Sequence, residues 1–134
     1  MDHITDAHAL LWHLYWPQRL GGAAQRVFAD ADAGQARIHV PAVVVAEAVM
    51  VAQKGRLPGA SLEHLLPHLR AMAESDNYPL LPLLPETVIA SHVYTTIPDI
   101  FDRLIVTEAI ARGLPLITRD PVIRQSGLAS TIWD

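Results

Sequence analysis

The chain has 134 residues, enough for one domain with a substantial hydrophobic core, and its content of 51% hydrophobic and 18% charged residues is typical of a compact soluble protein. Its formal net charge of −4 excludes nucleic-acid binding through overall basicity, and the absence of cysteine excludes disulfides and thiolate chemistry. Because the apolar runs are too short to cross a bilayer and the N-terminus lacks the features of a signal peptide, we expect a single domain over residues 1–134, located in the cytoplasm and without membrane contact.

Short apolar stretches alternate with longer helical patterns along the whole chain. Strands are expected, in chain order, over residues 3–5, 37–40, 80–84, 116–118 and 130–133. Helices are expected over residues 7–16, 25–33, 41–53, 61–72, 86–94, 100–112 and 121–125, with Pro67 kinking or dividing the fourth. The alternation predicts an α/β fold in which a central, mainly parallel sheet lies between two layers of helices.

The stretch from Pro98 to Asp120 has the pattern of a helix, a tight turn, a buried strand and then an acid. Asp99 stands where a helix N-cap would, and Asp102 follows at the spacing of a capping box. Residues 116–118 are apolar enough for a strand that is buried on both faces. Asp120 therefore falls at the C-terminal end of this strand, the edge of an open parallel sheet at which ligands bind.

Glu47 is the second informative acid. Every other residue from Val40 to Ala52 is apolar, so the glutamate lies in the middle of a predicted buried helix. An unpaired buried carboxylate costs several kcal/mol or shifts its pKa until it is neutral. We therefore expect Glu47 to have a partner or a bound cation.

Four acids are predicted to meet at one edge of the sheet. Asp6, Glu47, Asp102 and Asp120 each lie at the end of a predicted strand or in the helix that follows one. Carboxylates this close repel one another unless a positive charge lies between them. Oxygen ligands without cysteine or a histidine triad favour Mg²⁺ or Mn²⁺ over zinc, and such ions activate water for attack on a phosphodiester.

Simpler explanations compete with these assignments. Each of the four aspartates Asp6, Asp99, Asp102 and Asp120 could simply cap a helix, which is a commoner role for an acid than metal binding, whereas Glu47 caps nothing. The histidines form no recognisable metal set. We interpret the three tryptophans as core or interface residues rather than a base-stacking platform. Three arginines beside the acids are candidate phosphate contacts, although solvated surface is the commoner role for any one of them: Arg103, Arg119 and Arg124.

Four segments together resemble the PIN-domain proteins, of the VapC-like toxin type from bacterial toxin-antitoxin pairs. The segments are Asp6 to Trp12 (DAHALLW), Val40 to Ala48 (VPAVVVAEA), Pro98 to Ile105 (PDIFDRLI) and Leu116 to Asp120 (LITRD). They span nearly the whole chain in the order and spacing of the family. The resemblance implies a PIN-like α/β/α sandwich.

The resemblance also implies a function and a set of site residues. The family's acidic quartet corresponds to Asp6, Glu47, Asp102 and Asp120, with Asp99 as an accessory acid. Thr118 corresponds to the hydroxyl beside the last carboxylate and is a further candidate substrate contact. It implies a Mg²⁺- or Mn²⁺-dependent endoribonuclease, the toxin of a toxin-antitoxin system, which hydrolyses RNA with a metal-activated water. It further implies a homodimer and a cognate antitoxin as partners.

Two departures from the family pattern concern the surroundings of the acids. Ala7 stands where threonine or serine is common after the first acid, and Val44 stands where a serine often precedes the glutamate by three residues. Both departures reduce polar support around a metal, while all four carboxylates are retained. Reduced activity is therefore compatible with the sequence.

Two rival functions are weighed against the nuclease. A phosphoacceptor signalling domain has a similar size and an acidic pocket, but it needs a lysine at a strand end, and the only lysine, Lys54, follows a helix in a Lys-Gly-Arg turn. A catalytically weak or inactive PIN-like interaction module would keep the fold for binding a partner. Metal-dependent RNA cleavage distinguishes the nuclease from this module.

Overall fold

Five parallel strands form one sheet in the order β3-β2-β1-β4-β5. The computed structural model describes residues 1–134. The strands are β1 (Asp2–Thr5), β2 (Arg37–Pro41), β3 (Leu80–Leu81), β4 (Leu116–Ile117) and β5 (Thr131–Ile132). The α-helices are α1 (Ala7–Tyr15), α2 (Gly22–Asp32), α3 (Ala42–Gln53), α4 (Leu62–Ala73), α5 (Pro85–Ala90), α6 (Ile100–Arg112) and α7 (Pro121–Ser126), and the short 3-10 helices are η1 (Pro17–Arg19) and η2 (Ser91–Val93).

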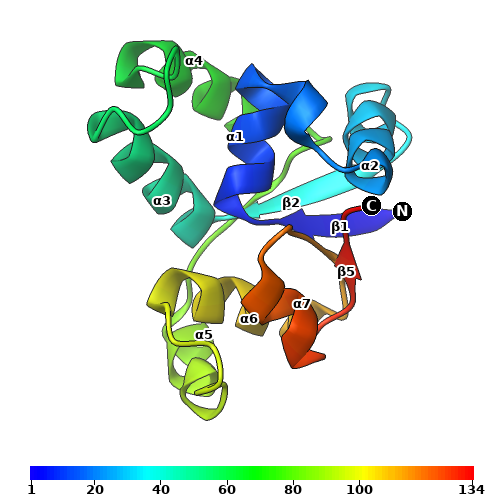
Figure 1. Ribbon diagram of the computed structural model, residues 1–134, viewed down its shortest axis with the longest axis vertical. Coiled ribbons are helices and arrows are strands. Elements are labelled where there is room, and N and C mark those ends of the chain that lie inside the picture. Colours follow the sequence, from blue (N-terminus) through cyan, green and yellow to red (C-terminus); the bar gives the residue numbers. More distant parts are fainter.

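Helices cover both faces of the sheet, which confirms the predicted α/β/α architecture. Figure 1 shows α1 to α4 on one side of the strands and α5 to α7 on the other. β1 lies at the centre, paired with β2 along one edge and with β4 along the other. The central strands are buried between the helical layers, and their fully buried side chains include Ile4, Ile38, Val40, Leu116 and Ile117. No helix has the length and hydrophobicity needed to span a membrane.

Two elements differ from the sequence-based prediction. β3 is limited to two residues because Pro82 follows it and cannot donate to a neighbouring strand. Helix α4 continues through Pro67 instead of dividing there. Both Pro67 and Glu63, whose carbonyl would otherwise accept the missing hydrogen bond, are exposed, so water can satisfy that carbonyl.

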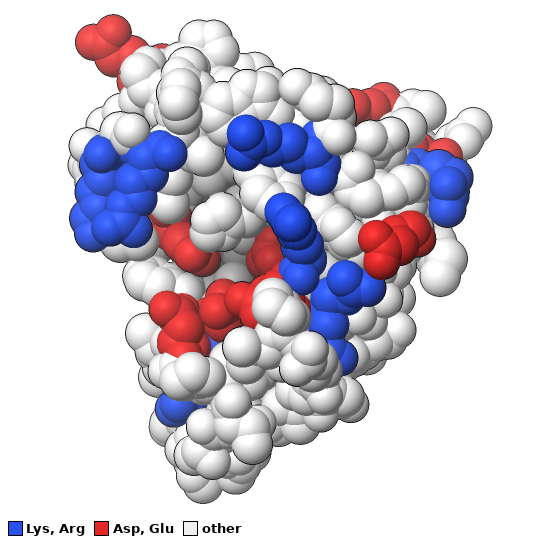
Figure 2. Space-filling model, viewed as in Figure 1, with Lys and Arg blue, Asp and Glu red and all other residues white.

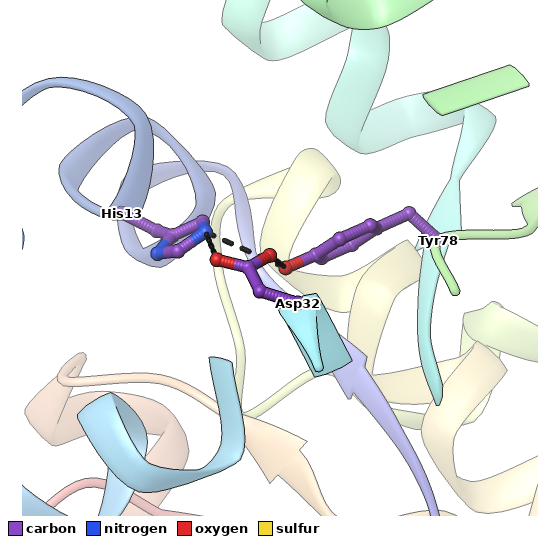
Figure 3. A network of polar contacts seen from close by, with 3 residues as sticks. All are labelled: His13, Asp32 and Tyr78. Atoms are coloured by element: carbon purple, nitrogen blue, oxygen red, sulfur yellow. Dashed lines mark hydrogen bonds and ion pairs between the residues drawn. The ribbon is translucent and has the colours of Figure 1, made fainter. Parts of the chain in front are cut away.

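A polar cluster joins α1, α2 and the segment before β3 (Figure 3). The Tyr78 hydroxyl donates to Asp32 Oδ1, and His13 Nε2 lies 3.3 Å from Asp32 Oδ2. The His13 ring stacks on Phe28 with their centroids 4.4 Å apart. Burial lowers the pKa of His13, while burial and the hydrogen bond to Asp32 raise the pKa of Tyr78. The Tyr78 hydroxyl therefore remains protonated and donates its hydrogen bond to Asp32. The cluster holds three separate elements together.

The C-terminal strand is fixed against the start of α2 by a very close backbone approach. The Ala24 N–H donates to the Trp133 carbonyl oxygen at 3.1 Å. A Cβ atom added at Gly21 would lie 2.2 Å from that oxygen, closer than any real contact. Glycine is therefore required at position 21, and it allows Trp133 to pack into the core.

We expect Gly21→Ala to destabilise the protein by about 2 kcal/mol, since the new methyl group forces the Trp133 backbone away from α2. Thermal unfolding would show a fall in Tm of roughly 5 °C. Gly22→Ala is the matched control, because the nearest atom to its Cβ is Arg26 Nη1 at 3.6 Å and alanine favours the helix. Equal melting temperatures for the two variants would contradict this packing.

Candidate active site

Three of the predicted acids cap helices. Asp6 follows β1 and caps α1, Asp99 caps α6, and Asp120 follows β4 and caps α7. In each, Oδ1 accepts backbone N–H groups: Ala9 at 2.8 Å for Asp6, Asp102 at 3.1 Å for Asp99, and Val122 and Ile123 at 2.8 and 3.2 Å for Asp120. The capping explanation is therefore correct, but it does not compete with a role in a site. Capping fixes where each carboxylate stands, at the C-terminal edge of the sheet.

The remaining two acids, Glu47 and Asp102, cap no helix. Glu47 lies in the middle of α3, and Asp102 lies in the first turn of α6, a helix that contacts α3. Both side chains are half-buried. Because neither forms an ion pair, their charges are not compensated by any basic side chain within 4.0 Å.

All five acids line one cavity of about 620 Å³. It lies where the N-termini of α1, α6 and α7 meet the middle of α3, at the C-terminal ends of β1 and β4. Figure 2 shows acidic side chains around a hollow in this face of the molecule, with basic side chains along part of its rim. The acids are Asp6, Glu47, Asp99, Asp102 and Asp120.

Burial and mutual repulsion disfavour the charged forms of these carboxyls. Burial, followed by the negative charges of Asp99, Asp120, Glu47 and Asp6, raises the pKa of Asp102 from 3.8 to about 7. Burial also raises the pKa of Glu47, although the charge of nearby His8 partly opposes this. A positive charge inside the cavity would relieve all of these repulsions.

Asp6 is the most deeply buried of the five carboxyls. Burial raises its pKa, and hydrogen bonds from the Thr118 hydroxyl and the Ala9 N–H oppose the rise. Thr118 is itself fully buried, and its Oγ1 accepts the Asp120 N–H at 3.1 Å. The threonine therefore links two of the acids and has no exposed surface with which to contact a substrate.

The three arginines predicted to contact phosphate are placed differently: Arg119 and Arg124 line the cavity, and Arg103 does not. Arg119 is exposed and lines the cavity. Arg103 does not line it, and its Nε donates to the Ile97 carbonyl at 2.9 Å. Although Arg103 follows Asp102 in sequence, successive helical residues point about 100° apart, so the arginine turns away when the acid faces the cavity.

Aromatic residues form another part of the cavity lining. Trp12 and Trp133 both line it, with ring centroids 5.7 Å apart in an edge-to-face arrangement. His8 also lines it and packs edge-on against Trp12 at 6.3 Å. We interpreted the tryptophans as core or interface residues; Trp133 is indeed buried, but both also line the candidate site. The C-terminal position of Trp133 gave no local signal of this proximity.

A comparison with models of known families shows that the model described as PIN domain matches residues 4–127. The chain belongs to the PIN domain family. A solved structure, VapBC2 from Rickettsia felis bound to a DNA fragment from their promoter, contains a chain similar in fold, with a TM-score of 0.72 and 14% sequence identity over 100% of both chains. A comparison with curated proteins finds no significant match. The fold and the family thus agree with the resemblance drawn from the sequence.

The donor set of this PIN domain suits a hard divalent cation. Five carboxylates are brought together with one histidine, His8, and no cysteine, which favours Mg²⁺ or Mn²⁺ over zinc, and burial together with the charges of the neighbouring acids raises the pKa of Asp102. No three His, Asp or Glu side chains stand in an arrangement that would hold a metal ion without adjustment. Binding would therefore require the free carboxylate oxygens to move inward.

We expect the metal-free protein to lose stability as the pH rises from about 4 to about 7. The folded-state pKa of Asp102 is raised from 3.8 to about 7, so the folded protein holds a proton over this range that the unfolded chain releases. The contribution of Asp102 to stability is thus complete below its pKa in the unfolded chain, and it is lost as the pH rises through its pKa in the folded protein.

Calorimetric Tm values measured in EDTA should fall less over this pH range for Asp102→Asn than for the wild type. The two falls should differ by a few degrees, at about 3 °C per kcal/mol. The difference between the two Tm profiles isolates the contribution of Asp102, because every other titrating group is the same in the two proteins. Asp76→Asn, at an exposed acid outside the cavity, serves as control and should follow the wild type. Parallel profiles for Asp102→Asn and wild type would show that Asp102 does not titrate here.

Proposed function

We propose that this PIN domain protein is a Mg²⁺- or Mn²⁺-dependent endoribonuclease that hydrolyses RNA phosphodiester bonds. The observation that carries the proposal is the single cavity lined by five carboxyls, with no basic side chain paired to them. Structural acids are normally paired or solvated, whereas here burial and mutual repulsion raise the pKa of three of them. Such a cavity is suited to holding a cation.

Each carboxyl has a role in the proposal. Asp6, Asp102 and Asp120 bind the ion directly or through water, Glu47 is a further ligand or orients the attacking water, and Asp99 adds negative charge at the rim. When bound, the cation lowers the pKa of a water molecule and offsets the charge that develops on the phosphodiester. Arg119, at the cavity wall and without a carboxylate partner, binds a phosphate of the substrate.

We further propose that the protein is a VapC-type toxin controlled by a cognate antitoxin. The sequence segments that resemble VapC-like toxins contain all five acids of the cavity, and the solved chain of similar fold belongs to VapBC2. In a toxin, uncontrolled RNA cleavage would harm the cell, so an inhibitory partner that covers the acidic cavity is the natural complement. A PIN-like module that only binds a partner is the alternative, and Ala7, which lines the cavity and offers no hydroxyl, favours it.

We expect purified wild-type protein to cleave a mixed RNA pool in Mn²⁺ but not in EDTA. Asp102→Asn and Asp120→Asn should each lower the cleavage rate by at least about 100-fold, since metal ligands matter more than their supporting partners. Gel electrophoresis of the RNA measures cleavage, and calorimetric titration with Mn²⁺ measures metal binding. The Asp76→Asn variant, which makes the same chemical change on an exposed loop, should cleave like wild type.

The combination of the two measurements separates the alternatives. Metal binding without cleavage of the pool would indicate a narrow RNA target. Absence of both metal binding and cleavage would refute the nuclease and favour the interaction module. Undiminished Mn²⁺ binding by Asp102→Asn would show that the ion, if bound, is held elsewhere.

We also propose that the protein is a homodimer that uses an apolar surface around α5. This apolar end consists of Leu83, Leu84, Val88, Ile89, Val93 and Ile100, each between 39% and 61% exposed. The three elements that carry most of it, α5, η2 and α6, contact one another. Figure 2 shows the corresponding end of the molecule almost free of charged side chains. An exposed apolar surface of this kind marks an association site in soluble proteins.

Ile89→Glu should convert the dimer to a monomer, because it places a charge on the most exposed aliphatic side chain of the apolar end. Sedimentation velocity measures the change. Val122→Glu on α7 introduces the same charge at an exposed valine outside the apolar end and should leave the dimer intact. A wild type that sediments as a monomer at all concentrations would refute the dimer.

A further inference from the structure

A second cavity adjoins the acidic one and is lined by arginines. It has a volume of about 470 Å³ and includes Arg19, Arg119 and Arg124 in its lining. We call it the arginine cavity. Arg119, Arg124 and Trp133 line both cavities, so the two lie side by side and share a wall. Figure 2 shows basic side chains bordering the acidic hollow on this face.

Two of the three guanidinium groups are uncompensated. Arg19 and Arg119 form no ion pair, whereas Arg124 Nη2 lies 3.1 Å from the exposed Asp134 Oδ2. The protein as a whole carries a net charge of −4, so this local excess of positive charge contrasts with the rest of the surface. A cavity that gathers unpaired cations beside a cluster of acids is an anion site rather than a general basic surface.

Tryptophans hold the two unpaired arginines in place. The Arg19 guanidinium lies 4.8 Å from the Trp16 ring centroid, and that of Arg119 lies 5.6 Å from the Trp12 centroid. Trp12 in turn packs edge-on against Trp133. A guanidinium held over an aromatic ring keeps its N–H groups free at its edge, where they can form a fork to phosphate oxygens.

We propose that the arginine cavity binds phosphate groups of the RNA strand next to the scissile bond, with Arg19 as a substrate-binding residue. This inference rests on the proposed nuclease function and extends it beyond Arg119. A strand whose scissile phosphate lies among the acids must continue out of the acidic cavity. The arginine cavity adjoins it and offers the next phosphates of the strand the unpaired guanidinium groups of Arg19 and Arg119.

An acidic protein segment is the other ligand that arginines attract, but the geometry favours RNA. The acidic cavity repels a carboxylate-rich segment and, with a cation bound, attracts a phosphodiester. Because Arg119 borders both cavities, a ligand that binds Arg119 also lies beside the acidic cavity and has to be compatible with it. A nucleic-acid strand meets this requirement along its whole length because its phosphates repeat regularly.

The test measures RNA binding separately from cleavage. Asp102→Asn protein is titrated, in Mn²⁺ and separately in EDTA, into a fluorescein-labelled single-stranded RNA dodecamer of mixed sequence, and anisotropy is recorded at several salt concentrations. Adding Arg19→Gln should weaken binding roughly tenfold at low salt. It should also reduce the slope of log K against log salt by about 0.7, the change expected for one lost phosphate contact on a single strand.

Arg70→Gln is the matched control, because it removes the same charge from an exposed residue of α4 that lines neither cavity. It should leave the slope unchanged. If Arg19→Gln behaves like Arg70→Gln, or if the protein without either substitution binds no RNA, the proposal is overturned. If an oligoglutamate binds more tightly than RNA and only that binding is lost in Arg19→Gln, the cavity docks an acidic segment and the proposal is likewise overturned.

The outcome is independent of the nuclease assay. Loss of RNA binding in Arg19→Gln, combined with a wild type that neither binds Mn²⁺ nor cleaves RNA, would support the arginine cavity while refuting the hydrolytic function. Normal cleavage in Mn²⁺, combined with unchanged binding by Arg19→Gln, would overturn the arginine cavity alone.

Discussion

The repulsion among carboxyls at the C-terminal edge of the sheet is the constraint on which the rest of the site depends. Burial and neighbouring negative charges raise the pKa of Asp102 to about 7, and the same factors raise those of Glu47 and Asp6. Gathering these carboxyls in one cavity costs stability, because burial and mutual repulsion both disfavour their charged forms. The cation proposed above would enter this cavity and replace repulsion between the carboxyls with attraction to a shared positive charge.

The fold tolerates this cluster because helix N-termini supply local compensation. Asp6, Asp99 and Asp120 each direct Oδ1 to backbone N–H groups at the start of a helix, where the helix dipole favours negative charge. One carboxylate oxygen thus stabilises the fold. In Asp99 and Asp120 the second oxygen accepts no hydrogen bond from the protein, so it remains available to a ligand. The capping and ligand roles of these residues are consequently complementary.

Local patterns in the sequence predicted the architecture and the five acids, but they could not predict contacts between distant segments. The alternation of strands and helices determines where the strand ends gather, and a strand end fixes Asp6 and Asp120 directly. By contrast, Trp12 and Trp133 meet at the cavity only because β5 pairs with β4. The His13, Asp32 and Tyr78 cluster likewise depends on tertiary packing, as no local signal relates residues from three separate elements.

The two departures from the family pattern have different structural consequences. Val44 is fully buried and does not line the cavity, so its apolar side chain belongs to the packing of α3. Ala7 lines the cavity beside Asp6, and an alanine there offers no hydroxyl to a carboxylate or a water. With fewer donors nearby, protons compete more strongly with a cation for the carboxyls, and metal binding at neutral pH must displace the proton of Asp102. A metal-dependent activity in this cavity should therefore increase as the pH rises through about 7, while the stability of the metal-free protein decreases over the preceding range.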